Sequence, residues 1–304
     1  MAFFISACMN THPTSNKKVQ RAWVMYDWAN SVYSLVITST IFPVYYNSVT
    51  KGVDGSDTVS FFGWEVINTV LYSYSISFSF LVIALLAPLL SGIADASGNK
   101  LNFMKFFVYL GSLACISLFF FTGENLEFGI ICSVLASVGF SGSIVFYNAF
   151  LPEIASTEEQ DKLSARGFAT GYLGSSVLLI LIVIASSFYK ELGFDDTIEV
   201  FSWGFVAVGA WWIVFSQYTF KHLPAEKKIK VSYKEVVKNG FKETKKVWQQ
   251  IKAEELLHQY IITYFFISMG LQTLVLIAPL FALENLGVAS SQLIVTALII
   301  QVAG

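Results

Sequence analysis

The chain has 304 residues, of which 55% are hydrophobic and only 13% are charged, and its net charge is −2. An ordinary soluble domain carries about twice that share of charged residues, so the composition excludes this class. The nearly balanced charge gives no strong positive field, which argues against a nucleic-acid-binding protein. The mean hydropathy of +0.62 indicates a protein embedded in a lipid bilayer.

Apolar runs long enough to cross a bilayer recur along the chain, since a spanning helix needs about 20 such residues. In chain order the predicted spans are Ala22–Tyr46, Val66–Ala94, Asn102–Thr122, Phe128–Leu151, Gly167–Tyr189, Val200–Phe220 and Leu257–Leu283. An eighth begins near Gln292 and stops at Gly304, short of the bilayer thickness, so we expect a C-terminally truncated chain. All spans are predicted as helices, because an open sheet would leave backbone groups unpaired in lipid. The alternation of serine and aromatic residues at Tyr72–Phe80 lies inside a long apolar run and is also predicted as helix.

Positive charges gather on one side of these spans. With the N-terminus in the cytoplasm, seventeen of the 19 Lys and Arg residues fall on the cytoplasmic side, and only Lys51 and Lys190 fall outside. Ten of the seventeen lie between Lys221 and Lys252, but without them the ratio is still seven to two. This bias sets the orientation of membrane proteins, so a cytoplasmic N-terminus is predicted.

The spans divide the chain into four parts. These are a cytoplasmic tail (1–21), a six-helix bundle (22–220), a basic cytoplasmic linker (221–256) and the start of a second bundle (257–304). Transporters made of two six-helix halves have this organisation. The linker carries amphipathic stretches at Val231–Tyr233 and Phe241–Trp248, which favour a position on the membrane surface or a simple connection between bundles.

Polar residues follow one face of several predicted spans. In the first span they fall within an arc of about 100°, which should face a cavity or the bundle interior. Similar stripes occur in the fourth and seventh spans. The predicted substrate-cavity residues are Asp27, Asn30, Ser34, Thr38, Ser137, Ser141, Asn148, Tyr264 and Gln272, with Ser31, Ser133 and Ser268 on the same stripes.

Asp27 is the only acidic residue inside a predicted span, and an intramembrane carboxylate is a functional candidate by default. It could carry a proton or bind a cationic group of a substrate. Alternatively it lies at the membrane interface near Trp23 and Trp28, where it would pair with Arg21 or Arg166.

Glycines open the fifth predicted span, at Gly167, Gly171 and Gly174. Small residues at this spacing let two helices approach closely, so packing is the favoured interpretation and a hinge is the second.

Enzyme chemistry is not predicted. The segment Gly139–Gly142 matches the G-x-S-G of intramembrane serine proteases, but such a serine needs a nearby base. The three histidines, His12, His222 and His258, all lie outside or at the edge of the spans. The three cysteines, Cys8, Cys115 and Cys132, show no disulfide or zinc spacing, and no metal or cofactor is expected.

Four segments together resemble one family. They are Tyr26–Tyr33 followed by Ile41–Pro43, Ala87–Lys100, Tyr147–Ile154 and Ser164–Gly174. The resemblance is to the "unknown major facilitator" group of the major facilitator superfamily, which is similar to fungal vacuolar amino-acid effluxers. It implies an all-α major-facilitator bundle, with about eight of twelve transmembrane helices present. It also implies a secondary active transporter that works by alternating access on a small solute, with amino-acid efflux as the expected activity.

The resemblance also implies a gating segment. Asp95, Gly98 and Lys100 match the superfamily signature between the second and third helices, whereas Ser91 stands where a glycine is expected and Ala96 replaces a cation. The predicted gating residues are Asp95, Gly98, Lys100, Glu153 and Arg166. Glu153 and Arg166 carry opposite charges on one short loop and are expected to form a latch pair.

Membrane lipid, a small solute and a coupling proton are the expected partners. The superfamily's antiport motif is absent from the fifth span, so the resemblance implies no coupling mode. The short outside loops, which lack disulfides, fit a bacterial inner membrane. The alternative function is a non-transporting receptor or scaffold that recruits a partner through its basic loop.

Overall fold

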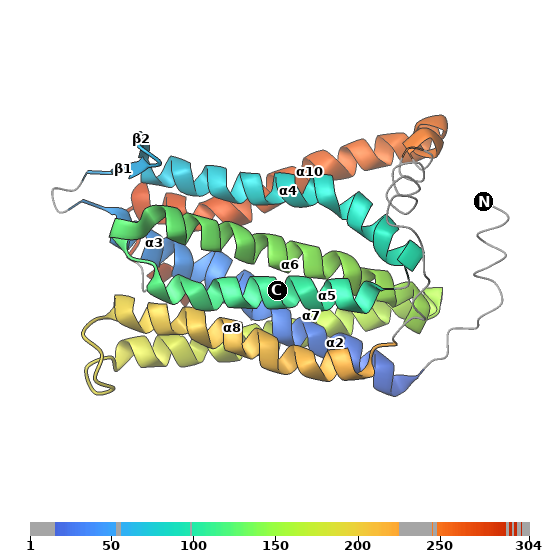
Figure 1. The fold of residues 1–304 in the computed structure, drawn as a ribbon, viewed down its shortest axis with the longest axis horizontal. Coiled ribbons are helices and arrows are strands. Elements are labelled where there is room, and N and C mark those ends of the chain that lie inside the picture. Colours follow the sequence, from blue (N-terminus) through green and yellow to red (C-terminus); the bar gives the residue numbers. More distant parts are fainter. Residues whose placement is uncertain are drawn as a thin grey trace.

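The computed structural model describes residues 16–52, 56–97, 99–224 and 248–289, together with residues 245, 292, 293, 295, 296 and 299. Long helices run side by side in an elongated bundle (Figure 1). The elements in chain order are α2 (Lys17–Val32), η1 (Tyr33–Ile41), α3 (Phe42–Thr50), β1 (Thr58–Phe61), β2 (Trp64–Ile67), α4 (Asn68–Ser97), α5 (Lys100–Ser117), η2 (Leu118–Phe120), η3 (Gly123–Asn125), α6 (Leu126–Ile154), α7 (Thr157–Ser187), α8 (Thr197–His222) and α10 (Glu255–Glu284).

Six stretches of the described residues are long and apolar enough to cross a membrane. They are Asn68–Ala87, Lys100–Phe120, Gly123–Ile154, Thr157–Ser187, Thr197–His222 and Glu255–Pro279. Each overlaps one predicted span, and the serine-rich stretch Tyr72–Phe80 is helical as predicted. Most of the predicted eighth span, residues 1–15 of the tail and much of the linker, including Val231–Tyr233, lie outside the described residues, whereas residues 17–21 of the tail belong to α2. The division into four domains therefore stays a prediction.

The first predicted span lies in a continuous helical run whose hydrogen-bond pattern changes twice. It is α-helical to Val32, a π-helix from Tyr33 to Ile41, and α-helical again from Phe42. A π-helix bonds each N–H to the carbonyl five residues earlier, and such segments are rare and frequently found at functional sites. This change was not predicted, and it decides which residues of the span face one another.

A short β-hairpin joins α3 to α4, in a connection largely outside the predicted spans for which the sequence predicted no element. Its two strands pair antiparallel with Phe61 opposite Trp64, so the turn contains two residues. Both have positive φ, +50° at Phe62 and +81° at Gly63, which is the conformation of a tight primed turn. Asparagine or glycine usually occupies the first turn position. Because Phe62 stands there, the sequence lacks the usual signal of a β-hairpin.

Helix α7 begins ten residues before the predicted span. The added turns carry charged residues, including Glu158 and Glu159, which favour a helix N-terminus but not a bilayer. Hydropathy alone therefore marks the apolar part of the helix and misses its polar extension.

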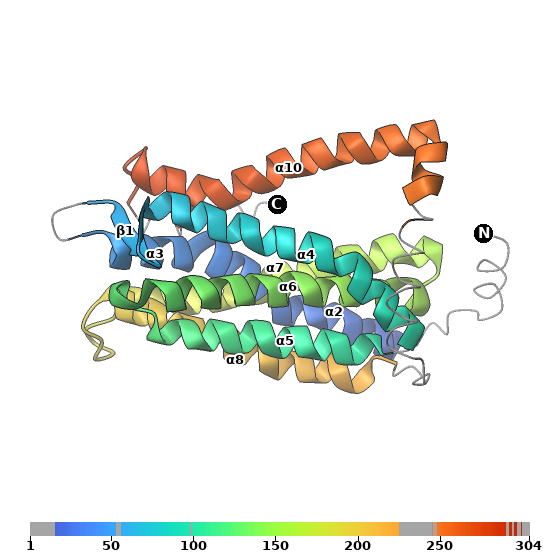
Figure 2. The same cartoon turned by 45° about the horizontal axis from the view of Figure 1, so that its top comes forward.

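The bundle packs around aromatic side chains. Helix α2 lies against α7 and α8, α5 against α6 and α8, and α4 against α6. Trp23, Tyr26, Phe146, Phe205 and Trp212 are among the large side chains that are almost fully buried. Helix α10 runs along the outside of this bundle, where its contacts include η1 and α3 (Figure 2).

Candidate functional site

A cavity of about 920 Å³ lies between the middle of the first helical run and helices α4, α6 and α10. Serine and threonine hydroxyls come from all four sides. Those that line it are Ser34, Thr38, Ser39, Ser73, Ser77, Ser79, Ser133, Ser137, Ser141, Ser268 and Thr273. Tyrosines, phenylalanines and aliphatic side chains fill the remainder of the wall, and the described lining residues include no charged side chain. The cavity therefore offers hydrogen bonds and apolar contact without a fixed charge.

Six of the predicted cavity residues lie in this wall. They are Ser34 and Thr38 from η1, Ser137 and Ser141 from α6, and Tyr264 and Gln272 from α10. The wall also contains Ser73, Ser77 and Ser79 of α4, which the sequence prediction did not select. A signal was present, because Ser73 and Ser77 are four residues apart and therefore share one face of an apolar helix.

Asp27, Asn30 and Asn148 are not among the residues that line the cavity. Asn30 is 3% exposed and accepts a hydrogen bond from the Ser31 hydroxyl, whereas Asn148 is exposed on α6. The predicted stripe assumed one helical period from residue 27 to residue 38. Asp27 and Asn30 precede the π-helix and lie on α2, where the Asp27 carboxylate meets α7 at Gly167 and not the cavity.

Asp27 lies in the seam of α2, by which we mean the surface where α2 packs against α6 and α7. Its carboxylate accepts a hydrogen bond from the Tyr147 hydroxyl of α6 at 2.6 Å. The Tyr147 ring stacks on Trp23 with centroids 4.3 Å apart, and the Trp23 indole donates to the Tyr147 carbonyl at 3.0 Å. Arg21 and Arg166, the two predicted ion partners, are exposed. Among the described residues Asp27 forms no salt bridge, so its observed partner is a hydroxyl rather than a cation.

The three glycines of α7 bring that helix against α2. A Cβ at Gly167 would collide with the Asp27 carboxylate, and one at Gly171 would meet the Ser31 hydroxyl. At Gly174 it would lie 2.9 Å from the Trp28 carbonyl oxygen. The spacing thus serves close helix packing, the favoured interpretation of the sequence.

The predicted gating residues are only partly described. Gly98 and the side chain of Asp95 lie outside the described residues, although the backbone of Asp95 belongs to the end of α4. Lys100 at the start of α5 forms a salt bridge with Glu153 near the end of α6. The observed partner of Glu153 is therefore Lys100, not the predicted Arg166, which is exposed on α7.

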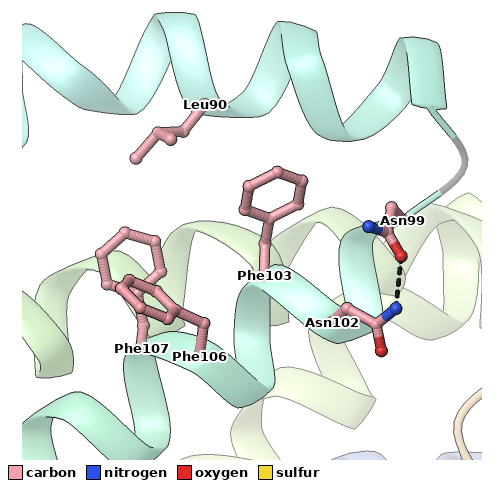
Figure 3. Close-up of a pocket in the computed structure, with 6 residues that line it drawn as sticks. All are labelled: Leu90, Asn99, Asn102, Phe103, Phe106 and Phe107. Atoms are coloured by element: carbon pink, nitrogen blue, oxygen red, sulfur yellow. Dashed lines mark hydrogen bonds between the residues drawn. The ribbon is translucent and has the colours of Figure 1, made fainter. Parts of the chain in front are cut away.

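A second hollow, of about 330 Å³, lies between α4 and α5 (Figure 3). Leu90, Phe103, Phe106 and Phe107 give it an apolar wall. Asn99 and Asn102 lie at one end and are hydrogen-bonded to each other (Figure 3). Its apolar wall makes it a poorer site for a polar solute than the hydroxyl-lined cavity.

Comparison with known proteins gives consistent matches. The family described as "Vacuole effluxer Atg22 like" matches residues 15–304. The Bacillus subtilis (strain 168) protein named uncharacterized MFS-type transporter YxiO is 31% identical over 94% of this chain and 64% of its own length. Autophagy-related protein 22 of Gibberella zeae is 27% identical over 55% of this chain and 28% of its own length. The chain thus spans less than two thirds of the length of these curated relatives.

Among solved structures, a crystal structure of a D-xylose–proton symporter matches with a TM-score of 0.50 over 95% of this chain and 66% of that chain. The sequence identity is 11%, so this likeness concerns the fold alone. It confirms the predicted major-facilitator type of helical bundle.

Proposed function

Because this chain belongs to the family of Atg22-like vacuole effluxers, we propose that it is part of a secondary active transporter that moves a small solute by alternating access. Family and fold are those of transporters rather than enzymes. The hydroxyl-lined cavity between η1, α4, α6 and α10 is the observation that carries the proposal. The sequence assigns α10 to a second bundle, so the proposed solute site lies where two bundles would move relative to each other.

The proposed solute carries no net charge. A buried ion needs an opposite charge or a dense set of dipoles, and the described wall supplies hydroxyls, phenols and one carboxamide instead. Small polar solutes match these groups, and in a zwitterionic amino acid the hydroxyls would have to act as the dipoles that compensate the ammonium and the carboxylate. The family name supports movement out of a compartment, and amino acids are the solutes that we propose.

Proton coupling is proposed through Asp27. It is a half-buried carboxylate on the first helix, hydrogen-bonded to Tyr147 and close to the α7 backbone at Gly167. A carboxylate in this position can gain and lose a proton as helices α2, α6 and α7 move. The solved structure with a similar fold belongs to a proton symporter, which supports proton coupling as such.

The protein is a multi-pass membrane protein, and we propose the bacterial inner membrane with a cytoplasmic N-terminus. The B. subtilis relative supports a bacterial location, and the distribution of Lys and Arg supports the orientation. Membership of a transporter family favours transport over the scaffold alternative.

Flux measured in proteoliposomes tests the solute class. The full protein should move a labelled amino acid without net charge, and an excess of uncharged amino acids should compete more strongly than lysine or glutamate. In Ser141→Ala, which removes a cavity hydroxyl, KM should rise about fivefold, as for one lost hydrogen bond.

Ser143→Ala is the matched control, because Ser143 lies on the same helix but is fully buried and donates to the Phe140 carbonyl at 2.7 Å. Its KM should equal that of the parent. Stronger competition by charged amino acids, or equal KM values in Ser141→Ala and the parent, would contradict the proposed site.

A further inference from the structure

The π-helix η1 presents five consecutive or nearly consecutive side chains to the cavity. These are Tyr33, Ser34, Ile37, Thr38 and Ser39. In an α-helix, where each residue turns about 100° around the axis, Ser39 would lie about 140° from Ser34 and would leave the cavity side. A π turn contains more residues than an α turn, so the same five steps bring Ser39 closer to the direction of Ser34. The π pattern therefore brings the Ser39 hydroxyl into the wall, whereas Thr38, four residues after Ser34, would face the cavity in either pattern.

Thr40 supports this pattern from outside the cavity. It is 0% exposed and is not a lining residue. Its hydroxyl lies 2.8 Å from the carbonyl oxygen of Leu35 and 2.7 Å from that of Val36. Leu35 is five residues earlier in the chain, so the hydroxyl adds a side-chain bond across one π turn.

Pro43 opposes the α pattern at the same place. An α-helix would need the N–H of residue 43 to bond the carbonyl of Ser39, but proline has no N–H and its ring clashes with that carbonyl. The backbone N–H of Phe42 bonds the carbonyl of Ile37, again five residues earlier. Pro43 thus disfavours the α pattern, and Thr40 stabilises the π pattern.

We infer that Thr40 is a positioning residue for the solute site: its buried hydroxyl holds η1 in the π pattern, which turns Ser39 toward the solute. The inference rests on the proposed transport function, because solute binding is the role that we propose for the cavity. The geometry itself can be tested without transport.

Thiol labelling reports which way residue 39 faces. Ser39→Cys and Ser34→Cys are made separately in the full protein with its native cysteines replaced, each with and without Thr40→Val. Valine keeps the shape of threonine but lacks the hydroxyl. With a water-soluble maleimide, Thr40→Val should slow labelling of the Ser39→Cys thiol about tenfold, the effect of a shared buried hydrogen bond. The Ser34→Cys thiol should change less than about twofold, because α2 ends one residue before η1 and fixes its direction.

Two further variants separate a change in the direction of residue 39 from general damage to the structure. Thr40→Ser keeps the hydroxyl and should restore labelling of the Ser39→Cys thiol. Thr50→Val removes another buried hydroxyl of the same helical run, which bonds the Tyr46 carbonyl at 2.7 Å, and should leave labelling unchanged.

Unchanged labelling of the Ser39→Cys thiol in Thr40→Val would overturn the inference. An equal loss at both thiols would also overturn it, since that would show a collapsed cavity rather than a changed helical pattern. Because no flux is measured, either result is distinguishable from a failure of the transport proposal.

Discussion

Helices α7 and α10 differ sharply in how they meet the first helical run. Helix α7 lies close against α2, where the positions of three glycines leave no room for a side chain. Helix α10 touches η1 and α3, yet none of its described residues is buried, and Gly270 at its centre has open space around it. Both helices are apolar and of similar length.

The contrast shows that hydropathy does not distinguish a helix that builds a core from one that borders a cavity. The α2–α7 seam is close-packed, like a protein interior, so its residues determine stability. The wall between η1 and α10 is hollow and hydroxyl-lined, so its residues are free to bind a solute. A transporter that works by alternating access needs both a close-packed bundle and a boundary that can open.

The largest effect that separates the two regions should come from enlarging a glycine. In Gly171→Leu the new side chain would meet the Ser31 hydroxyl and the Asp27 carbonyl oxygen, so we expect a loss of about 3 kcal/mol in stability. Gly270→Leu is the matched change on α10 and should leave stability unchanged. Thermal unfolding of both purified variants in detergent measures the difference, and equal unfolding temperatures would show that the seam is not close-packed.

A smaller effect should follow from removing the Tyr147 hydroxyl. Tyr147→Phe leaves the Asp27 carboxylate without its observed donor, which should cost about 2 kcal/mol, the range for a hydrogen bond to a charged group. Tyr264→Phe on α10 removes an exposed hydroxyl and should not change the unfolding temperature. Equal stability of the two variants would indicate that Asp27 draws its stabilisation from elsewhere.

The Asp27→Asn variant separates the charge from the hydrogen bond. Tyr147 can donate to the amide oxygen as well, so the protein should unfold close to the parental temperature. If Asp27 carries the coupling proton, the response of flux to a pH gradient should nevertheless fall about tenfold, which corresponds to about 1.4 kcal/mol. A parental response to the gradient would remove Asp27 from the coupling proposal.

The helices could be predicted because bilayer thickness sets a length that apolar runs either reach or miss. Their polar ends could not, since residues 157–166 of α7 are charged and helical at once. The hairpin at Phe62 and the π-helix at Tyr33 also escaped prediction. The turn has Phe62 in place of the usual asparagine or glycine, and the π pattern depends on Thr40 and Pro43, whose effect on backbone hydrogen bonding cannot be read from hydropathy.

The cavity was predictable in part, because polar stripes in apolar helices must face something other than lipid. The stripes of α6 and α10 placed Ser137, Ser141 and Gln272 in the wall, as the structure does. The stripe of the first helix led to Asp27, which packs in the seam instead. Sequence spacing gives a direction around the helix axis, but it does not tell whether a neighbouring helix or a cavity lies in that direction.

The smallest effect should come from the end of the bundle, where the Lys100–Glu153 salt bridge joins α5 to α6. The side chains are 11% and 35% exposed, so water screens part of the attraction and Lys100→Met should cost less than about 1 kcal/mol. The cost should shrink further in 1 M salt, where screening is stronger. Lys162→Met, at an exposed position of α7, should have no effect. A loss in Lys100→Met as large as that in Gly171→Leu would mean that this salt bridge, and not the glycine seam, holds the bundle together.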